Sequence, residues 1–189
     1  MKQIIFGNAM FSMFRGVVVA FQNKWVGRAI FGGLILMSIA SVALLAAWGL
    51  RDQYKVVWNL SESLPQHLFV IEMGVKPQKG DLVAFKWVKD DSTPMNPYPY
   101  GTTFVKILEG VPGDVIVERN REFFIDGKSL GFAKQLSKKG HQLNLGHVGV
   151  IPPASYYVRG THRDSLDSRY DLLGLVSEKD VLGRAFAVF

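Results

Sequence analysis

The most constraining feature of this sequence is a run of 22 residues without a charged side chain, AIFGGLILMSIASVALLAAWGL, at positions 29–50. As a helix, a run of this length crosses a hydrocarbon core about 30 Å thick. The alternative is a buried core helix, but a segment that is apolar on all faces over this length argues against it. We therefore expect residues 29–50 to form an N-terminal transmembrane helix.

Residues 1–28 form a basic arm, which predicts the orientation of this helix. The arm has no acidic residue and four basic ones: Lys2, Arg15, Lys24 and Arg28. By the positive-inside rule, the N-terminus is expected in the cytoplasm and residues 51–189 outside it. A cleavable signal peptide is the alternative. The apolar run is too long for one and ends in a poor cleavage site, AAWGLRDQY, which favours an uncleaved anchor.

The charge distribution also limits the choice of partners. The net charge is +6 and the arm supplies four of these charges, whereas residues 51–189 carry 18 basic and 16 acidic side chains. These residues show no basic patch interleaved with aromatics, so no nucleic-acid partner is expected. Within the arm, Arg15 interrupts residues 3–22, and an amphipathic helix on the inner membrane surface is favoured over a second span.

Beyond residue 50 the sequence changes to short runs rich in β-branched and aromatic residues. These runs are LFVIEM, DLVAFKWV, TTFVKIL, DVIVE, EFFIDG, SYYVRG and RAFAVF. Gly, Pro and Asp separate them, as in KPQKGD, VPGD, DGKSLG and IPPAS. We therefore expect a mainly β fold, with strongly bent antiparallel sheets over residues 51–189. Residues 107–160 are expected to contain a hairpin and a polar insert at 131–149.

The absence of cysteine restricts the possible nucleophiles to serine, threonine, lysine or a carboxylate, or to a metal-bound water. The four histidines lack HExxH or similar spacing, so neither a metal site nor a cofactor is expected. His162 and Asp167 could complete a Ser-His-Asp triad, which chain order neither supports nor excludes. A neutral lysine can also activate serine if burial lowers its pKa well below about 10.4. Lys106, inside the apolar run FVKIL, is the candidate for this role.

Taken separately, these candidates have simpler interpretations. Lys106 could be a strand lysine that points to solvent, and Ser63 a turn serine beyond a membrane helix. Four blocks in order favour a different interpretation: NLSESLP, KGDLVAF, FVKILEGVPGD and YYVRGTHRDSLDSRYDLLGLV. The set resembles the type I signal peptidase family of serine proteases, and more closely its conjugative-transfer, TraF-type branch. The branch's nucleophile block, approximately Asn-x-Ser/Thr-x-Ser-x-Pro, is similar to residues 59–65.

The resemblance covers nearly all of residues 58–189 and implies a signal-peptidase-like β domain with a Ser/Lys dyad. Ser63 would be the nucleophile and Lys106 the general base. A serine hydroxyl is a poor nucleophile until such a base takes its proton. The Ser61 hydroxyl would bind the oxyanion beside the backbone N–H of Ser63, and each such donor is worth on the order of 3 kcal/mol.

The same resemblance implies roles for five further residues. Ser165 would orient the lysine amine, while Asp167 and Arg169 would form an ion pair that supports this block. Their alternative is an ordinary surface ion pair, which contributes little. Leu64 and Val105 would line the small pocket for the residue before the scissile bond.

The resemblance also implies a substrate and a location. The expected substrate is an exported precursor protein or prepilin with small residues before the cut, bound as an added strand near Ser63 and Val105. The enzyme would sit in the bacterial inner membrane with its catalytic domain in the periplasm, beside conjugation or type IV secretion components. Water, or the pilin's own N-terminus, would resolve the acyl-enzyme. The alternatives are a general housekeeping signal peptidase and a catalytically silent assembly factor of the same fold.

The chain departs from the family pattern at several positions. Ile107 stands where many members have arginine, and Gly160-Thr161-His162 replaces the usual GDN. The branch's nucleophile block commonly continues Pro-x-Gly-x-Tyr, whereas this chain has His67 at the glycine position and Phe69 at the tyrosine position. Those two substitutions fall where the substrate groove is expected and remove no catalytic group.

Overall fold

A computed structural model describes residues 24–59, 61–89, 96 and 98–188 of the 189-residue chain. The chain divides into two units at residue 51, a helical one and a β domain over Asp52–Phe189, and each is described by itself. The surface helix expected over residues 3–22 lies outside the described residues. So does most of the Pro-rich loop around residues 90–97.

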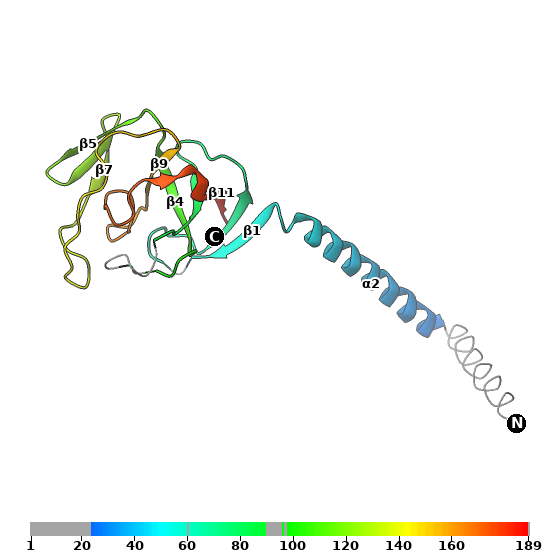
Figure 1. Cartoon of the computed structure of the whole chain (residues 1–189). Helices are drawn as coiled ribbons and strands as arrows, with labels where there is room; N and C mark the ends of the chain where they lie inside the picture. Colours follow the sequence, from blue (N-terminus) through cyan, green and yellow to red (C-terminus); the bar gives the residue numbers. More distant parts are fainter. Residues whose placement is uncertain (1–23, 60, 90–95, 97, 189) are drawn as a thin grey trace, which may run out of the picture. The chain divides into compact units, whose positions relative to one another are not determined.

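The helix α2, Lys24–Leu50, is 27 residues long and has no buried residue (Figure 1). It begins five residues before the uncharged run and ends where that run ends. Its length and composition suffice to cross a membrane. Beyond its last residue, the Arg51 guanidinium lies 4.1 Å from the centre of the Trp48 ring. The predicted N-terminal apolar helix is confirmed.

Within the described residues, the β domain forms two sheets. The larger has the order β1-β2-β11-β3-β4-β9-β10 and the smaller the order β7-β6-β5-β8. Figure 1 labels four strands of the larger sheet and two of the smaller. The strands of the larger sheet are β1 Tyr54–Trp58, β2 Leu68–Met73, β3 Leu82–Lys86, β4 Thr103–Gly110, β9 Ser155–Arg159, β10 Val176–Ser177 and β11 Val181–Ala187. Those of the smaller are β5 Val115–Arg119, β6 Glu122–Ile125, β7 Lys128–Phe132 and β8 Gly149–Val150; a 3-10 turn, η1 Glu178–Asp180, precedes β11.

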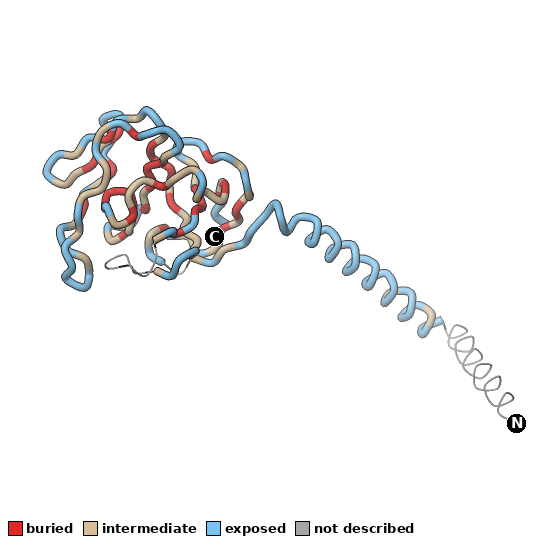
Figure 2. Tube along the Cα trace, viewed as in Figure 1, coloured by how far each residue is buried: buried red, intermediate tan, exposed pale blue. Residues whose placement is uncertain are grey.

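All pairings between these strands are antiparallel, which confirms the predicted mainly β fold. Buried positions concentrate inside the domain (Figure 2). One apolar cluster gathers around Val83, Phe85 and Leu108 of the larger sheet. A second gathers around Ile116 and Phe123 of the smaller sheet. These clusters give the domain a core that needs no disulfide.

One expected turn is shorter than predicted. The stretch DGKSLG separates two strands in the sequence analysis, but only Asp126 and Gly127 form the turn, with φ of 51° and 76°. Strand β7 begins at Lys128 and pairs with β6. Two residues with positive φ are the geometry of a tight hairpin turn, so the remaining residues are free to pair.

Strand β4, which carries Lys106, has one edge that is only partly paired. Along one side it pairs with β3 from Thr103 to Ile107. Along the other, its register with β9 begins only at Ile107, so in the described structure Thr103–Lys106 has one edge without a strand partner. Lys55 of β1 donates a hydrogen bond to the Thr103 side chain at 3.3 Å. The sheet therefore curls until its β1 edge approaches this open edge of β4.

Candidate active site

A cleft of about 360 Å³ lies between the β1 side of the sheet and the open edge of β4. We call it the serine cleft. Its lining residues are Val57, Trp58, Asn59, Ser61, Ser63, Tyr98, Thr102, Thr103, Phe104, Val105, Lys106 and Leu166. Four predicted site residues, Ser61, Ser63, Val105 and Lys106, therefore share one cleft.

A turn after β1 places the two serines in this cleft. The backbone N–H of Asn59 donates to the carbonyl of His67 at 2.7 Å, which closes the turn. The Asn59 side chain donates to the Gln66 carbonyl at 3.0 Å and, more weakly, to the Leu64 carbonyl at 3.4 Å. Its Oδ1 accepts the backbone N–H of Ser61 at 3.0 Å. An asparagine side chain can bond to backbone groups of its own turn in this way. The turn that carries the serines is therefore stabilised by a residue within it.

The Ser61 hydroxyl lies beside the Ser63 backbone amide. Ser61 Oγ donates to Asn59 Oδ1 at 2.7 Å and accepts the Ser63 N–H at 3.4 Å. The two donors expected around an oxyanion are therefore neighbours. In this state both donors are bonded to protein atoms: the Ser61 hydroxyl donates to Asn59, and the Ser63 N–H donates to Ser61.

The segment after β9 fixes the Ser63 carbonyl from the other side. The backbone N–H groups of Thr161 and His162 donate to it at 2.9 and 3.3 Å. Gly160 makes this approach possible, since a Cβ there would lie 2.1 Å from Ser165 Oγ and 2.8 Å from the Ser63 oxygen. Any side chain at position 160 would therefore force Ser165 and the Ser63 carbonyl to move.

Lys106 is 3% exposed, so it is not the solvent-facing strand lysine of the simpler interpretation. Its Nζ donates to Ser165 Oγ at 2.9 Å. Burial lowers the pKa of Lys106 to about 8; the Asp167 carboxylate opposes this shift and the Arg169 guanidinium adds to it. A substantial fraction of this amine is therefore neutral in mildly basic solution and able to accept a proton.

Asp167 and Arg169 form a buried, bidentate ion pair with N–O distances of 2.8 and 2.9 Å. Both are at most 4% exposed, so this is not a surface ion pair. Asp167 also accepts the Gly160 N–H at 3.1 Å, and Arg169 donates to the Phe132 carbonyl at 2.8 Å. The pair thus ties together the turn that carries Ser165, the end of β9 and the end of β7.

The triad alternative finds no support in this arrangement. The Asp167 carboxylate is taken by Arg169 and Gly160, whereas the His162 ring accepts the backbone N–H of Asp164 at 3.2 Å. No group of three His, Asp or Glu side chains that could hold a metal ion is found within the described residues.

Of the two residues predicted to line the substrate pocket, only one lines the serine cleft. Val105 lines the serine cleft, whereas Leu64 is buried and is not part of the lining. The pattern did not point to Tyr98, Phe104 and Leu166 as cleft residues, because they come from three separate segments. The contribution of Gly160 was also missed, although a glycine directly before a polar loop is a signal for close backbone approach.

The chain matches known proteins along most of its length. The family model for signal peptidase, peptidase S26, matches residues 28–189. Signal peptidase I P of Bacillus subtilis subsp. natto is 34% identical over 174 residues, which is 87% of each chain. Signal peptidase I of Pseudomonas fluorescens is 30% identical over 64% of this chain and 51% of its own length.

The chain therefore spans about half the length of the Pseudomonas relative but most of the Bacillus one. A signal peptidase I of Enterococcus faecalis V583, solved by crystallography, aligns with 58% of this chain and 96% of its own, at 27% identity and a TM-score of 0.36. On the family match over residues 28–189 and the Bacillus similarity, the chain belongs to the signal peptidase family, peptidase S26.

Proposed function

We propose that this protein is a membrane-anchored serine endopeptidase that removes signal or pro-sequences from exported proteins, with Ser63 as nucleophile and Lys106 as general base. The observation that carries the proposal is the buried Lys106 amine, bonded to Ser165 and lining the same cleft as Ser63. Membership of the signal peptidase family supports it.

In the proposed reaction, neutral Lys106 takes the hydroxyl proton of Ser63 while Ser63 Oγ attacks the substrate carbonyl carbon. The carbonyl oxygen becomes an oxyanion in a tetrahedral intermediate. When the C–N bond breaks, protonated Lys106 gives its proton to the leaving amine, and the acyl group stays on Ser63. Lys106 then activates a water that hydrolyses the ester and restores Ser63.

The oxyanion would be bound by the Ser61 hydroxyl and the Ser63 backbone N–H. Since the Ser61 proton is donated to Asn59 Oδ1, its hydroxyl must rotate before it can serve the oxyanion. Such a rotation about one bond is a small motion. Ser165 keeps the Lys106 amine in place, and the Asp167–Arg169 pair holds Ser165 through its turn.

The substrate would bind as an extended strand along the open edge of β4 at Thr103–Lys106. Val105 lines the cleft there and would contact the small side chain before the scissile bond. Leu64 would act by supporting the turn of Ser63, since it is buried.

The proposed location is the inner membrane, with α2 as a single-pass anchor, the N-terminus in the cytoplasm and the β domain in the periplasm. The basic residues before the apolar run support this orientation. The bilayer and exported precursors are then the partners, because a precursor's own signal segment emerges at the same surface.

A narrower candidate is the processing of a pilin precursor in a conjugative, type IV secretion system. The Asn-x-Ser-x-Ser-x-Pro block at residues 59–65 favours it, and the Asn59 contacts give that asparagine a structural task. A general housekeeping signal peptidase is equally consistent with the Bacillus similarity. The buried Lys106 with its lowered pKa argues against a catalytically silent assembly factor, because such a role does not require a neutral lysine.

The test is co-expression of the full chain with a candidate precursor, followed by mass spectrometry of the product. We expect Ser63→Ala and Lys106→Met to abolish processing, whereas Lys179→Met, an exposed lysine on η1, leaves it intact. Processing that survives in both dyad variants would refute the proposal. A product lighter by one water than the hydrolysed pilin would indicate cyclisation.

A further inference from the structure

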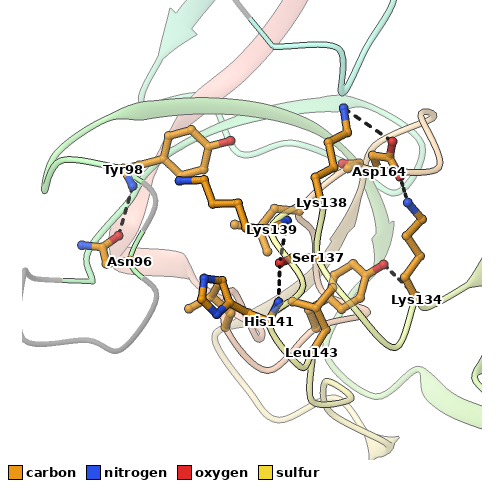
Figure 3. A pocket seen from close by; sticks show the side chains of 13 residues that line it. Asn96, Tyr98, Lys134, Ser137, Lys138, Lys139, His141, Leu143 and Asp164 are labelled. Atoms are coloured by element: carbon orange, nitrogen blue, oxygen red, sulfur yellow. Dashed lines mark hydrogen bonds and ion pairs between the residues drawn. The ribbon is translucent and has the colours of Figure 1, made fainter.

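A second cavity, of about 440 Å³, is drawn in Figure 3. It adjoins the serine cleft, because the two have lining residues in common. We call it the lysine cavity. It is lined by Asn96, Tyr98, Lys134, Ser137, Lys138, Lys139, His141, Leu143, Asp164, Ser165, Leu166, Tyr170 and Leu172. The proposed peptidase reaction uses only Ser165 of this set.

Three contacts connect the lysine cavity to the reacting groups. Tyr98 and Leu166 line both hollows, so they form a shared wall. Ser165 faces the lysine cavity and accepts the hydrogen bond of Lys106 from the serine cleft. Lys138 forms an ion pair at 3.4 Å with Glu62, the residue next to Ser63. The two hollows are therefore adjacent, so a chain that leaves the serine cleft on this side would reach the lysine cavity.

Lys138 and Lys139 belong to a defined turn of the polar insert. The Ser137 side chain accepts the backbone N–H groups of Lys139 and His141 at 3.3 and 3.1 Å. Gly140 closes the turn with φ of 80°, a conformation that favours glycine. The Arg121 guanidinium holds both limbs of the insert by donating to the carbonyls of Lys134 and Leu143.

The charges of the cavity are unbalanced. Three lysines face one aspartate, Asp164, which pairs with Lys134 and, at 3.5 Å, with Lys138. Among the described residues, the ammonium of Lys139 has no ion-pair partner. Figure 3 shows the lysines and His141 around one hollow, with Tyr98 across it from Lys134. Leucines at 143, 166 and 172 give the cavity apolar wall area beside this positive charge.

We propose that the lysine cavity binds an acidic segment of the precursor, on the far side of the scissile bond from the residues held along β4. This inference rests on the proposed peptidase function. The β4 edge and Val105 would hold the residues before the cut, so the residues after it would reach the lysine cavity. An aspartate or glutamate there would pair with Lys139, because Lys138 is already paired with Glu62 and Asp164, and its methylene groups would contact the leucines.

The test uses the full chain in neutral detergent and fluorogenic peptides with small residues before the cut. Each of the first three positions after the cut carries Ala, Glu or Lys in turn. We expect Glu at one of these positions to raise kcat/KM about two- to fivefold over Ala, as for a partly exposed ion pair. The gain should disappear in about 1 M salt, because screening removes it.

Lys139→Glu should reverse the preference, so that the Lys peptide is cleaved faster than the Glu peptide. Lys179→Glu is the matched control, since this exposed lysine lies on η1 and lines neither hollow. An unchanged charge preference in Lys139→Glu would overturn the proposal. So would loss of binding to anionic phosphatidylglycerol vesicles without a change in peptide preference, because the cavity would then face lipid.

A binding measurement separates this inference from the proposed function. In the Ser63→Ala variant, fluorescence anisotropy should show tighter binding of the Glu peptide than of the Ala peptide, and Lys139→Glu should remove the difference. If that preference is present but the wild-type chain cleaves no peptide, the peptidase proposal fails and the acidic-segment site stands. Equal binding of both peptides contradicts the site itself.

Discussion

The carboxamide of Asn59 serves two ends of the serine turn at once. Its nitrogen donates to the Gln66 and Leu64 carbonyls, and its oxygen accepts both the Ser61 hydroxyl and the Ser61 backbone N–H. An oxygen cannot replace the nitrogen, because it would face two carbonyls. A side chain without an acceptor would leave the Ser61 hydroxyl free to adopt other rotamers.

We predict that Asn59→Ala lowers kcat about tenfold, with a smaller change in KM, because Ser61 loses its orientation. Removing Ser61 itself should lower kcat about 100-fold, the order expected for one oxyanion donor. If Asn59 acts through Ser61, its substitution adds little in a Ser61→Ala background. Multiplicative loss in the double variant would instead show two independent roles. Asn59→Asp keeps the acceptor but should lower the melting temperature more than Ala does.

If Lys106 is the general base, as proposed, activity depends on pH in a definite direction. The base must be neutral, and burial places its pKa at about 8. The kcat/KM of the wild-type chain should therefore rise as pH increases through about 8 and level off above it. A profile that instead follows a group near pH 6.5 would point to histidine.

The same lysine makes stability depend on pH. In the unfolded chain its pKa is near 10.4, well above the folded value of about 8. Between pH 8 and 10.4 the unfolded state binds more protons, so the free energy of unfolding rises with pH. Lys106→Met removes this titration. We compare the free energy of unfolding of Lys106→Met with that of wild type by urea unfolding. The difference, variant minus wild type, should therefore be about 3 kcal/mol larger at pH 7 than above pH 10.4. A difference that is constant with pH would contradict a lowered lysine pKa.

At the scale of elements, the strands with one buried face could be foreseen. LFVIEM coincides with β2, Leu68–Met73, because its buried and part-buried residues alternate. Strand β1 was missed because it has no buried residue and follows the membrane run without a turn signal. Strand β7 was missed because Gly131 and Ser129 gave it the composition of a loop. Both depend on partner strands for their conformation.

The candidate site likewise has features that the sequence indicates and features that it does not. The Ser61–Ser63 spacing and the apolar surroundings of Lys106 are local, so the sequence indicated them once ordered blocks were compared. The contact between Thr161 and the Ser63 carbonyl joins residues 98 positions apart, and no local pattern encodes it. The lysine cavity likewise combines the insert with the loop after Gly160 and the residues near Tyr98.

The segment after β9 yields a prediction at this scale. Gly160→Ala places a Cβ within 2.1 Å of Ser165 Oγ and 2.8 Å of the Ser63 carbonyl. Because backbone as well as side-chain atoms must move, we expect kcat to fall at least tenfold and stability by about 1–3 kcal/mol. Gly32→Ala on α2 is the control, since the added Cβ would meet no neighbouring group within 4 Å. Full activity of Gly160→Ala would contradict the close packing of this loop.

At the scale of the whole molecule, the proposed catalytic residues and the proposed membrane anchor belong to different parts of the chain. The β domain has its own apolar clusters, and its proposed catalytic residues all lie between positions 61 and 169. The helix α2 contributes no buried residue. Folding of the domain should therefore not require the helix, whereas access to a substrate that is itself held in the bilayer should.

We predict that a chain beginning at Asp52 unfolds in urea in one cooperative transition, because the apolar clusters lie within the β domain. It should cleave short soluble peptides with kcat within about threefold of the full chain. Cleavage of a membrane-embedded precursor in vesicles should fall at least tenfold, since the anchor no longer concentrates the enzyme at the surface. The Ser63→Ala form of the shortened chain controls for contaminating proteases. Equal loss on both substrates would mean that the helix supports the site itself, and equal retention would mean that anchoring does not limit the reaction.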